Sequence, residues 1–171
     1  MAHKQQFDFV ESVKNKFPDN FYKAKVLEIG SLNINGTIRD LFVDCDYLGV
    51  DVGEGKDVDL VCLGQDLDHP DQTYDTTISC ECFEHNPDWE ETFLNMHRMT
   101  KIGGLVIFSC ATTGRPEHGT SRCSPADAPL ITWDYYRNLT EQDFNVEGMF
   151  SEHQFSTNQA TKDLYFYGVK K

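Results

Sequence analysis

Five short apolar runs recur between residues 25 and 109, and a break in the pattern follows each of them. The runs cover residues 25–30, 47–51, 58–62, 75–80 and 105–109. Because they are mostly apolar rather than apolar at alternate positions, each is expected to be a strand that is buried on both faces. Buried strands with helices between them are typical of a parallel, doubly wound sheet. The sequence therefore predicts an α/β fold.

Three segments carry helical patterns. The expected helices are an opening one within residues 1–20, a short one over residues 37–42 that Thr37 would cap, and one that begins at Pro87 with Asn86 as its N-cap and that Gly103 and Gly104 stop. The tail differs, since residues 145–155 and 163–169 are strand-like with no helix between them. These two segments are expected to pair as an antiparallel hairpin at one edge of the sheet.

Length and charge exclude several classes of protein. The chain has 171 residues and a net charge of −13, from 15 basic and 28 acidic side chains. Such a surface repels phosphate backbones and anionic membranes, so we expect no nucleic-acid or membrane partner. No apolar run approaches the ~20 residues of a membrane span, and the first residues lack an apolar signal core, so a cytoplasmic location is expected. The length predicts a single domain over residues 1–171.

Six cysteines are present, and no C-x-x-C pair occurs among them. Cys62, Cys80 and Cys110 each close an apolar run. With no export signal in the sequence, buried free thiols are expected rather than disulfides or a zinc knuckle.

Residues that directly follow the strands are the candidates for a binding site, since ligands of open α/β sheets bind beyond the carboxyl ends of the strands. Gly30 ends the first strand and permits a turn with close approach of a ligand. A dinucleotide fingerprint would need further glycines where the chain has Leu32 and Asn35, which argues against a pyrophosphate wrapped on this turn. Asp51 ends the second strand, where a carboxylate can accept the two hydroxyl hydrogen bonds of a ribose.

Acidic residues also follow the third and fourth strands. Asp66 could accept a hydrogen bond from an exocyclic amine of adenine. Glu81, Glu84 and His85 invite comparison with a metal site, but their spacing matches no strong ligand pattern, so no metal is expected.

Taken in order, these motifs resemble class I S-adenosylmethionine-dependent methyltransferases. The residues that carry the resemblance are Val-Leu-Glu-Ile-Gly30, Gly-Val-Asp51, Gln65-Asp66-Leu67, Ser79-Cys-Glu-Cys-Phe-Glu-His85, the helix after it, Gly103-Gly-Leu-Val-Ile-Phe108 and the terminal hairpin. The resemblance covers residues 22–171. It implies a Rossmann-like seven-stranded sheet in the order 3-2-1-4-5-7-6 with strand 7 antiparallel.

The resemblance also implies S-adenosylmethionine as cofactor and S-adenosylhomocysteine as product. Glu28 and Gly30 match the motif near the methionine part of the cofactor, Asp51 the acid on the ribose, Asp66 and Leu67 the adenine contacts, and Cys80 and Glu81 the floor of the pocket. Leu32 and Ile34 replace glycines of the family pattern, so residues 31–36 resemble a subgroup with a longer turn. The full set of expected cofactor-binding residues is Glu28, Gly30, Ser31, Asn35, Gly36, Asp51, Val52, Asp66, Leu67, Cys80 and Glu81.

The segment from 111 to 140 is about three times longer than a usual connection and is expected to be a lid at the acceptor end. His118 is the candidate general base, because its unperturbed pKa lies near neutrality. Arg115 and Arg137 are candidates to clamp an anionic acceptor, and Tyr135 and Tyr136 could serve either the acceptor or the packing.

Three functions stay open on the sequence alone. The first is methyl transfer to a small-molecule acceptor by a monomer or homodimer. The second is a nonenzymatic domain or partner subunit that binds the cofactor or a nucleoside. The third is a nicotinamide-dependent oxidoreductase, which the missing glycines and the terminal hairpin disfavour.

Overall fold

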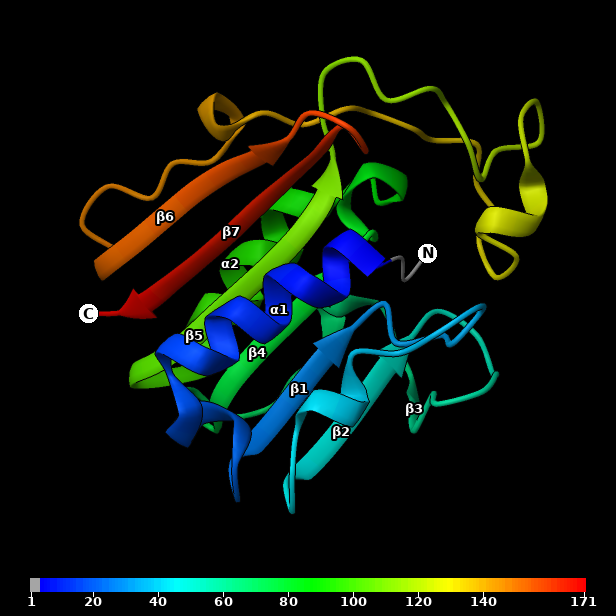
Figure 1. Cartoon of the computed structure of the whole chain (residues 1–171). Helices are drawn as coiled ribbons and strands as arrows, with labels where there is room; N and C mark the ends of the chain where they lie inside the picture. The colour runs from blue at the N-terminus through cyan, green and yellow to red at the C-terminus, as the bar shows by residue number, and fades with distance from the viewer. Residues whose placement is uncertain (1–3) are drawn as a thin grey trace.

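One seven-stranded sheet forms the centre of the protein, in the order β3-β2-β1-β4-β5-β7-β6. The structure is a computed structural model that describes residues 4–171. The strands are β1 (Lys25–Ile29), β2 (Asp46–Asp51), β3 (Leu60–Val61), β4 (Tyr74–Cys80), β5 (Thr100–Ala111), β6 (Phe150–Asn158) and β7 (Asp163–Lys170). Strands β1 to β5 pair in parallel, and β7 is antiparallel to both β5 and β6 (Figure 1). The predicted strand order and the antiparallel β7 are confirmed.

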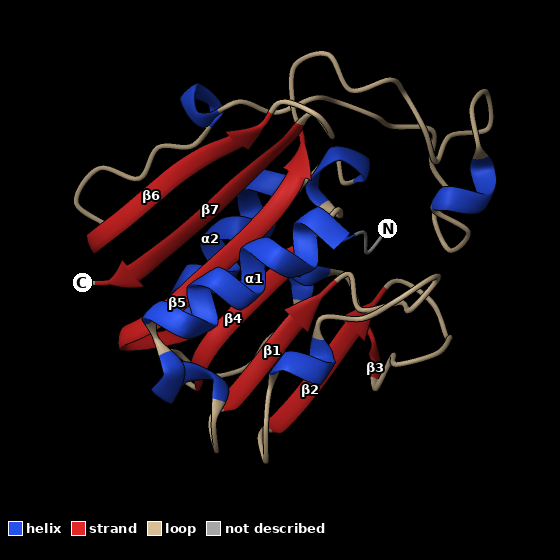
Figure 2. Ribbon diagram, in the orientation of Figure 1, coloured by secondary structure: helices blue, strands red, loops and turns tan. Residues whose placement is uncertain are grey.

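Two α-helices cover opposite faces of this sheet (Figure 2). Helix α1 (Lys4–Lys16) buries Val10 and Val13 in one apolar cluster, and α2 (Trp89–Met99) buries Phe93 and Met96 in the other. Because helices lie on both faces, the central strands β1, β4 and β5 are buried on both sides, as their apolar sequences predict. The same prediction is wrong for the edge strand β3, where Leu60 and Val61 are exposed, and holds only in part for β2.

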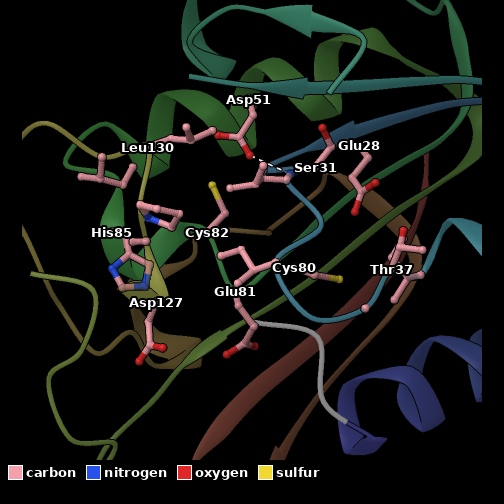
Figure 3. A pocket seen from close by; sticks show the side chains of 18 of the residues that line it. Glu28, Ser31, Thr37, Asp51, Cys80, Glu81, Cys82, His85, Asp127 and Leu130 are labelled. Atoms are coloured by element: carbon pink, nitrogen blue, oxygen red, sulfur yellow. Dashed lines mark hydrogen bonds between the residues drawn. The ribbon is translucent and has the colours of Figure 1, made fainter. Parts of the chain in front are cut away.

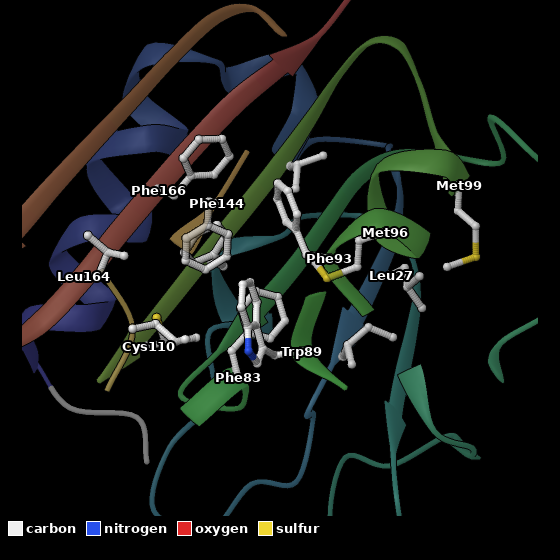
Figure 4. Packing of buried hydrophobic residues seen from close by; sticks show 14 of the residues in the cluster. Leu27, Phe83, Trp89, Phe93, Met96, Met99, Cys110, Phe144, Leu164 and Phe166 are labelled. Atoms are coloured by element: carbon white, nitrogen blue, oxygen red, sulfur yellow. The ribbon is translucent and has the colours of Figure 1, made fainter. Parts of the chain in front are cut away.

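The core on the α2 side of the sheet contains a group of aromatic rings among aliphatic side chains (Figure 4). The Phe93 ring lies edge-on to Phe108, Phe144 and Phe166, with centroid distances of 5.8, 5.4 and 6.1 Å. Edge-to-face contacts at these distances add to the free energy gained by burying the rings. These ring contacts pack β5, β7 and the segment before β6 together in one layer. This packing helps to fix the carboxyl ends of the parallel strands.

The helix expected over residues 37–42 is not formed. Only Arg39–Leu41 forms a single 3₁₀ turn there, and the backbone N–H of Arg39 donates to the Thr37 hydroxyl at 3.0 Å. Six residues are too few to offset the cost of helix nucleation, so packing of Ile38 and Leu41 against α1's side of the sheet decides the local structure.

The bounds predicted for the helix after β4, which is α2, are also wrong. The side-chain oxygen of Asn86 accepts the N–H of Asp88 at 2.9 Å, so Asn86 caps the turn that precedes the helix. Helix α2 itself begins at Trp89. The helix ends at Met99, and β5 begins at once with Thr100. Gly103 and Gly104 therefore lie within β5, where the pairing with β4 shifts register.

The terminal hairpin is confirmed, although its first strand begins at Phe150 rather than at residue 145. Between β5 and β6 the described chain contains no α-helix or strand, only the 3₁₀ turns Pro125–Asp127 and Glu141–Asp143. This long loop includes the expected lid segment and extends beyond the sheet (Figure 1). All six cysteines are free. Within residues 4–171 no helix is both long enough and apolar enough to span a bilayer.

Candidate functional site

A cavity of about 700 Å³, counting its open mouth, lies at the carboxyl ends of β1, β2 and β4. This is the edge of a parallel sheet where ligands are expected. Glu28 and Gly30 of β1 and its turn face it, with Asp51 of β2 and Cys80 of β4 (Figure 3). The long loop supplies the opposite wall with residues 127–131.

The turn after β1 needs glycine. Gly30 has a φ of +82°, and a Cβ there would lie 2.8 Å from the Cβ of Cys82. The backbone N–H groups of Gly30 and Ser31 both donate to the carbonyl of Val50, at 2.8 and 3.1 Å. These bonds hold the turn against β2 and place the buried Ser31 hydroxyl at the cavity, where it has no hydrogen-bond partner among residues 4–171.

Asp51 is oriented by two backbone amides. Its carboxylate accepts the N–H of Leu32 at 2.9 Å and that of Val52 at 2.7 Å, one on each oxygen. Burial raises the pKa of Asp51, and these two bonds oppose the rise. Each carboxylate oxygen keeps a further lone pair, so the group can still accept hydrogen bonds from a ligand.

Glu28 is a buried carboxyl that titrates near neutrality. Burial raises its pKa to about 7, although the Tyr47 hydroxyl, which donates to Oε2 at 2.8 Å, lowers it in part. A cationic group in the cavity would favour the ionised form.

The floor of the cavity is made of neutral thiols and one acid. Burial raises the pKa of Cys80 to about 12 and that of Cys82 further still, so neither is a thiolate near neutral pH. Glu81 accepts the Ser109 hydroxyl at 2.8 Å.

Most, but not all, of the predicted cofactor-binding residues meet here. Seven line the cavity, namely Glu28, Gly30, Ser31, Gly36, Asp51, Cys80 and Glu81. Val52 lines a smaller adjoining cavity of about 370 Å³ together with Cys62, Leu63, Gly64 and Gln65. Asn35, Asp66 and Leu67 line neither. Leu67 packs in the core instead, with its carbonyl held by Asn95 at 3.0 Å.

Several lining residues carry no signal in the sequence. Gln6 reaches the cavity from α1, His85 from the turn after β4, and residues 127–131 from the long loop. Because His85 directly follows Glu84, the sequence placed it near the site. Nothing in the sequence indicated that α1 or residues 127–131 would reach the cavity.

His118 does not line the cavity, but it contacts a residue that does. Its ring lies edge-on to that of His85, with centroids 4.9 Å apart, and Tyr136 packs against both rings. Burial and the neighbouring His118 lower the pKa of His85 to about 3, so His85 is neutral.

The two candidate arginines serve the fold rather than the cavity. Arg115 donates to the carbonyl of Thr161 at 2.6 Å and pairs with the fully buried Asp163 at 2.7 Å. Arg137 pairs with Asp143 at the surface. Neither arginine lines the main cavity or the smaller one, so the interpretation of these residues as an acceptor clamp is wrong.

Replacing Arg115 tests this structural role. We expect Arg115→Ala to lower the free energy of unfolding by about 3 kcal/mol, because it removes the guanidinium that pairs with the buried Asp163 carboxylate. Arg137→Ala, the matched control at an exposed pair, is expected to cost less than about 1 kcal/mol. Urea unfolding of both variants measures the difference, and equal losses would contradict the assignment.

Comparisons with known proteins agree with the geometry. Residues 41–108 match a family model described as a methyltransferase domain, and no curated protein is significantly similar to the chain in sequence. One similar solved structure is the 1,6-didemethyltoxoflavin-N1-methyltransferase of Burkholderia thailandensis with bound 1,6-didemethyltoxoflavin and S-adenosylhomocysteine. Its TM-score is 0.61 at 15% identity, over 100% of this chain and 92% of that one.

Other similar solved structures differ in how much of their length this chain matches. The YcgJ protein of Bacillus subtilis matches with a TM-score of 0.61 at 14% identity, over 99% of both chains. In contrast, the chain spans about half the length of two larger matched chains, 52% of the CurJ carbon methyltransferase and 47% of a Galdieria sulphuraria protein. At these identities the likeness shows the fold.

Proposed function

We propose that the chain is a class I methyltransferase domain, the type that uses S-adenosylmethionine, and that it methylates a small-molecule acceptor. The observation that carries the proposal is the cavity at the ends of β1, β2 and β4, in which a buried acid, a glycine turn and an oriented Asp51 face one volume. Isothermal titration with S-adenosylmethionine, S-adenosylhomocysteine and NAD tests it. Binding of the first two and not of NAD is expected.

The donor set of the cavity fits the cofactor. Asp51 would accept hydrogen bonds from the ribose hydroxyls, and the buried, unpartnered Ser31 hydroxyl would bond a polar atom of the ligand. Glu28 would pair with the ammonium group of the methionine part, and Val52 with residues 62–65 would line the adenine. When bound, the cofactor supplies a methyl group on a sulfonium, and its transfer to a nucleophile leaves the electron pair of the broken C–S bond on sulfur.

Residues of this chain would then align and shield the acceptor. Residues 127–131 close one wall of the cavity, which would exclude water and hold the acceptor in line. His118 remains the candidate base for a hydroxyl acceptor, since it contacts the cavity through His85. A basic or soft acceptor atom would need no such base.

Asp51→Ala is expected to weaken the binding of S-adenosylhomocysteine by ~1–3 kcal/mol, about 5- to 150-fold, through the lost charged hydrogen bonds. Isothermal titration gives the dissociation constant. Asp66→Ala is the matched control, because that acid lies outside both cavities and should leave affinity unchanged. Unchanged affinity in Asp51→Ala would remove the ribose role.

Binding of the cofactor product should depend on pH through Glu28. In the free protein its pKa is raised from 4.5 to about 7. The free energy of unfolding therefore decreases as the pH rises from 4.5 to 7. A ligand ammonium favours the ionised form, and S-adenosylhomocysteine should therefore bind about 10-fold more tightly at pH 8 than at pH 6. Glu28→Gln should abolish this dependence, and an unchanged pH profile in that variant would exclude Glu28 as its source.

The nonenzymatic alternative makes a different prediction. A domain that only binds the cofactor, or that serves as a partner subunit, would bind S-adenosylhomocysteine but would form none from S-adenosylmethionine with any acceptor of a broad panel. The contact of His118 with a cavity residue favours the enzyme.

A further inference from the structure

A second group of side chains lies beside the cavity, at its junction with the long loop. Glu84 and His85 come from the 3₁₀ turn after β4, and His118 comes from the loop. Each offers one ligand atom, a carboxylate oxygen or a ring nitrogen, and these three atoms lie within 4.8 Å of one another. The sequence did not predict this meeting, because 33 residues separate His118 from His85.

Glu84 is the least expected member of the group. Its side chain is fully buried, and among residues 4–171 neither carboxylate oxygen has a hydrogen-bond partner of normal geometry. Burial and then the neighbouring Glu81 raise the pKa of Glu84, and the backbone amides of Glu84 and Ala111 oppose the rise only in part. A buried carboxylate with so little support is costly unless a cation or a strong donor meets it.

The two histidines are free to act as ligands. His85 is 5% exposed, and within the described part of the chain its Nδ1 has no hydrogen-bond partner. The Nδ1 of His118 lies 3.1 Å from the carbonyl of Pro116, an arrangement in which Nδ1–H donates and Nε2 keeps its lone pair. Backbone carbonyls orient metal-bound histidines in this way.

We propose that Glu84, His85 and His118 form a binding site for one divalent transition-metal cation. Two imidazoles and one carboxylate are a donor set that Zn²⁺ and Fe²⁺ accept, and three protein ligands leave coordination positions open. The net charge of −13 adds a general attraction for cations.

The place of the site indicates its use, which rests on the proposed function. His85 lines the main cavity, so an open coordination position near it can take an oxygen or nitrogen of the acceptor. A bound metal would lower the pKa of an acceptor hydroxyl, whose proton then passes to solvent before the oxygen attacks the methyl group. If His118 binds the metal, it no longer acts as the general base. The acceptor would then be a molecule that can itself coordinate a metal.

Direct metal binding tests the proposal. The protein is stripped with a chelator, and Zn²⁺ is titrated in by calorimetry, with thermal unfolding followed in parallel. We expect one equivalent to bind and the melting temperature to rise. Co²⁺ replaces Zn²⁺ in a second titration, because ligation of Co²⁺ by a thiolate would give a near-ultraviolet charge-transfer band. The Cys123→Ser variant serves as the background, since it removes the exposed thiol.

Three variants complete the test. Glu84→Gln and His118→Ala should each weaken Zn²⁺ binding by about 100-fold or more, while His153→Ala, an exposed histidine on β6, should bind as the wild type does. Glu84→Gln should also leave the metal-free protein at least as stable, since it removes an unsupported buried acid. No Zn²⁺ binding by the wild type, undiminished binding by both cluster variants, or a thiolate band would overturn the site.

S-adenosylhomocysteine is titrated into the metal-free and the Zn²⁺-loaded protein in the same series. Its binding in the absence of any Zn²⁺ binding would overturn the metal site and leave the proposed function standing. Zn²⁺ binding without S-adenosylhomocysteine binding would support the site and overturn the cofactor assignment.

Discussion

Gly30→Val is expected to abolish measurable binding of S-adenosylhomocysteine, a loss of at least about 100-fold or ~2.8 kcal/mol. The residue adopts a φ of +82°, which a β-branched side chain rarely takes, and its Cβ would lie 2.8 Å from the Cβ of Cys82. Valine would therefore displace the turn that carries Ser31 and whose N–H groups donate to the Val50 carbonyl. Calorimetric titration measures the affinity, and circular dichroism checks that the variant is folded.

A matched glycine separates backbone strain from the local clash. Gly103 has a φ of +76°, a Cβ added to it would meet nothing within 4 Å, and it lies within β5, away from both cavities. Gly103→Val should keep normal affinity. Should Gly30→Val fail to fold, Gly30→Ala with Cys82→Gly removes the clashing partner and is expected to recover binding relative to Gly30→Ala alone. Normal binding by Gly30→Val would refute the role of the turn.

Apolar content predicted the sheet well, and short-range patterns predicted its connections poorly. Strands β1, β4 and β5 are buried on both faces, and their unbroken apolar runs predict that. The segment over residues 37–42 looked helical because Thr37 precedes apolar residues, yet it is too short to nucleate a helix. Gly103 looked like a helix stop, but a glycine with positive φ serves equally at an irregular strand position.

The same contrast holds for the site. Residues that directly end a strand, such as Glu28, Asp51 and Cys80, were found because topology alone brings strand ends together. Gln6 and the wall at 127–131 depend on how α1 and a long loop pack, and neither leaves a periodic signal. The resemblance placed the adenine contacts at Asp66 and Leu67, directly after residues 62–65, which line the smaller cavity. Leu67 packs in the core instead.

His118→Ala is expected to lower turnover about 100-fold or more while the affinity for S-adenosylhomocysteine stays within about 2-fold. The ring contacts His85 but lines neither cavity, so its loss should affect the acceptor rather than the cofactor. Formation of S-adenosylhomocysteine, followed over a panel of hydroxyl and amine acceptors, measures the rate. His153→Ala again serves as the control, and full activity in His118→Ala would assign His118 a structural role.

A base and a metal ligand at this position respond differently to a chelator. If His118 is a base, the wild type keeps its rate after removal of metal, and the pH profile of turnover loses one ionisation in His118→Ala. If His118 is a ligand, chelation reduces the wild type to the rate of the variant, and Zn²⁺ restores the wild type alone. Glu84→Gln tests the choice independently. A shared metal predicts that this variant lowers turnover in parallel with His118→Ala and that Zn²⁺ does not restore it, whereas a base at His118 predicts that Glu84→Gln keeps its rate.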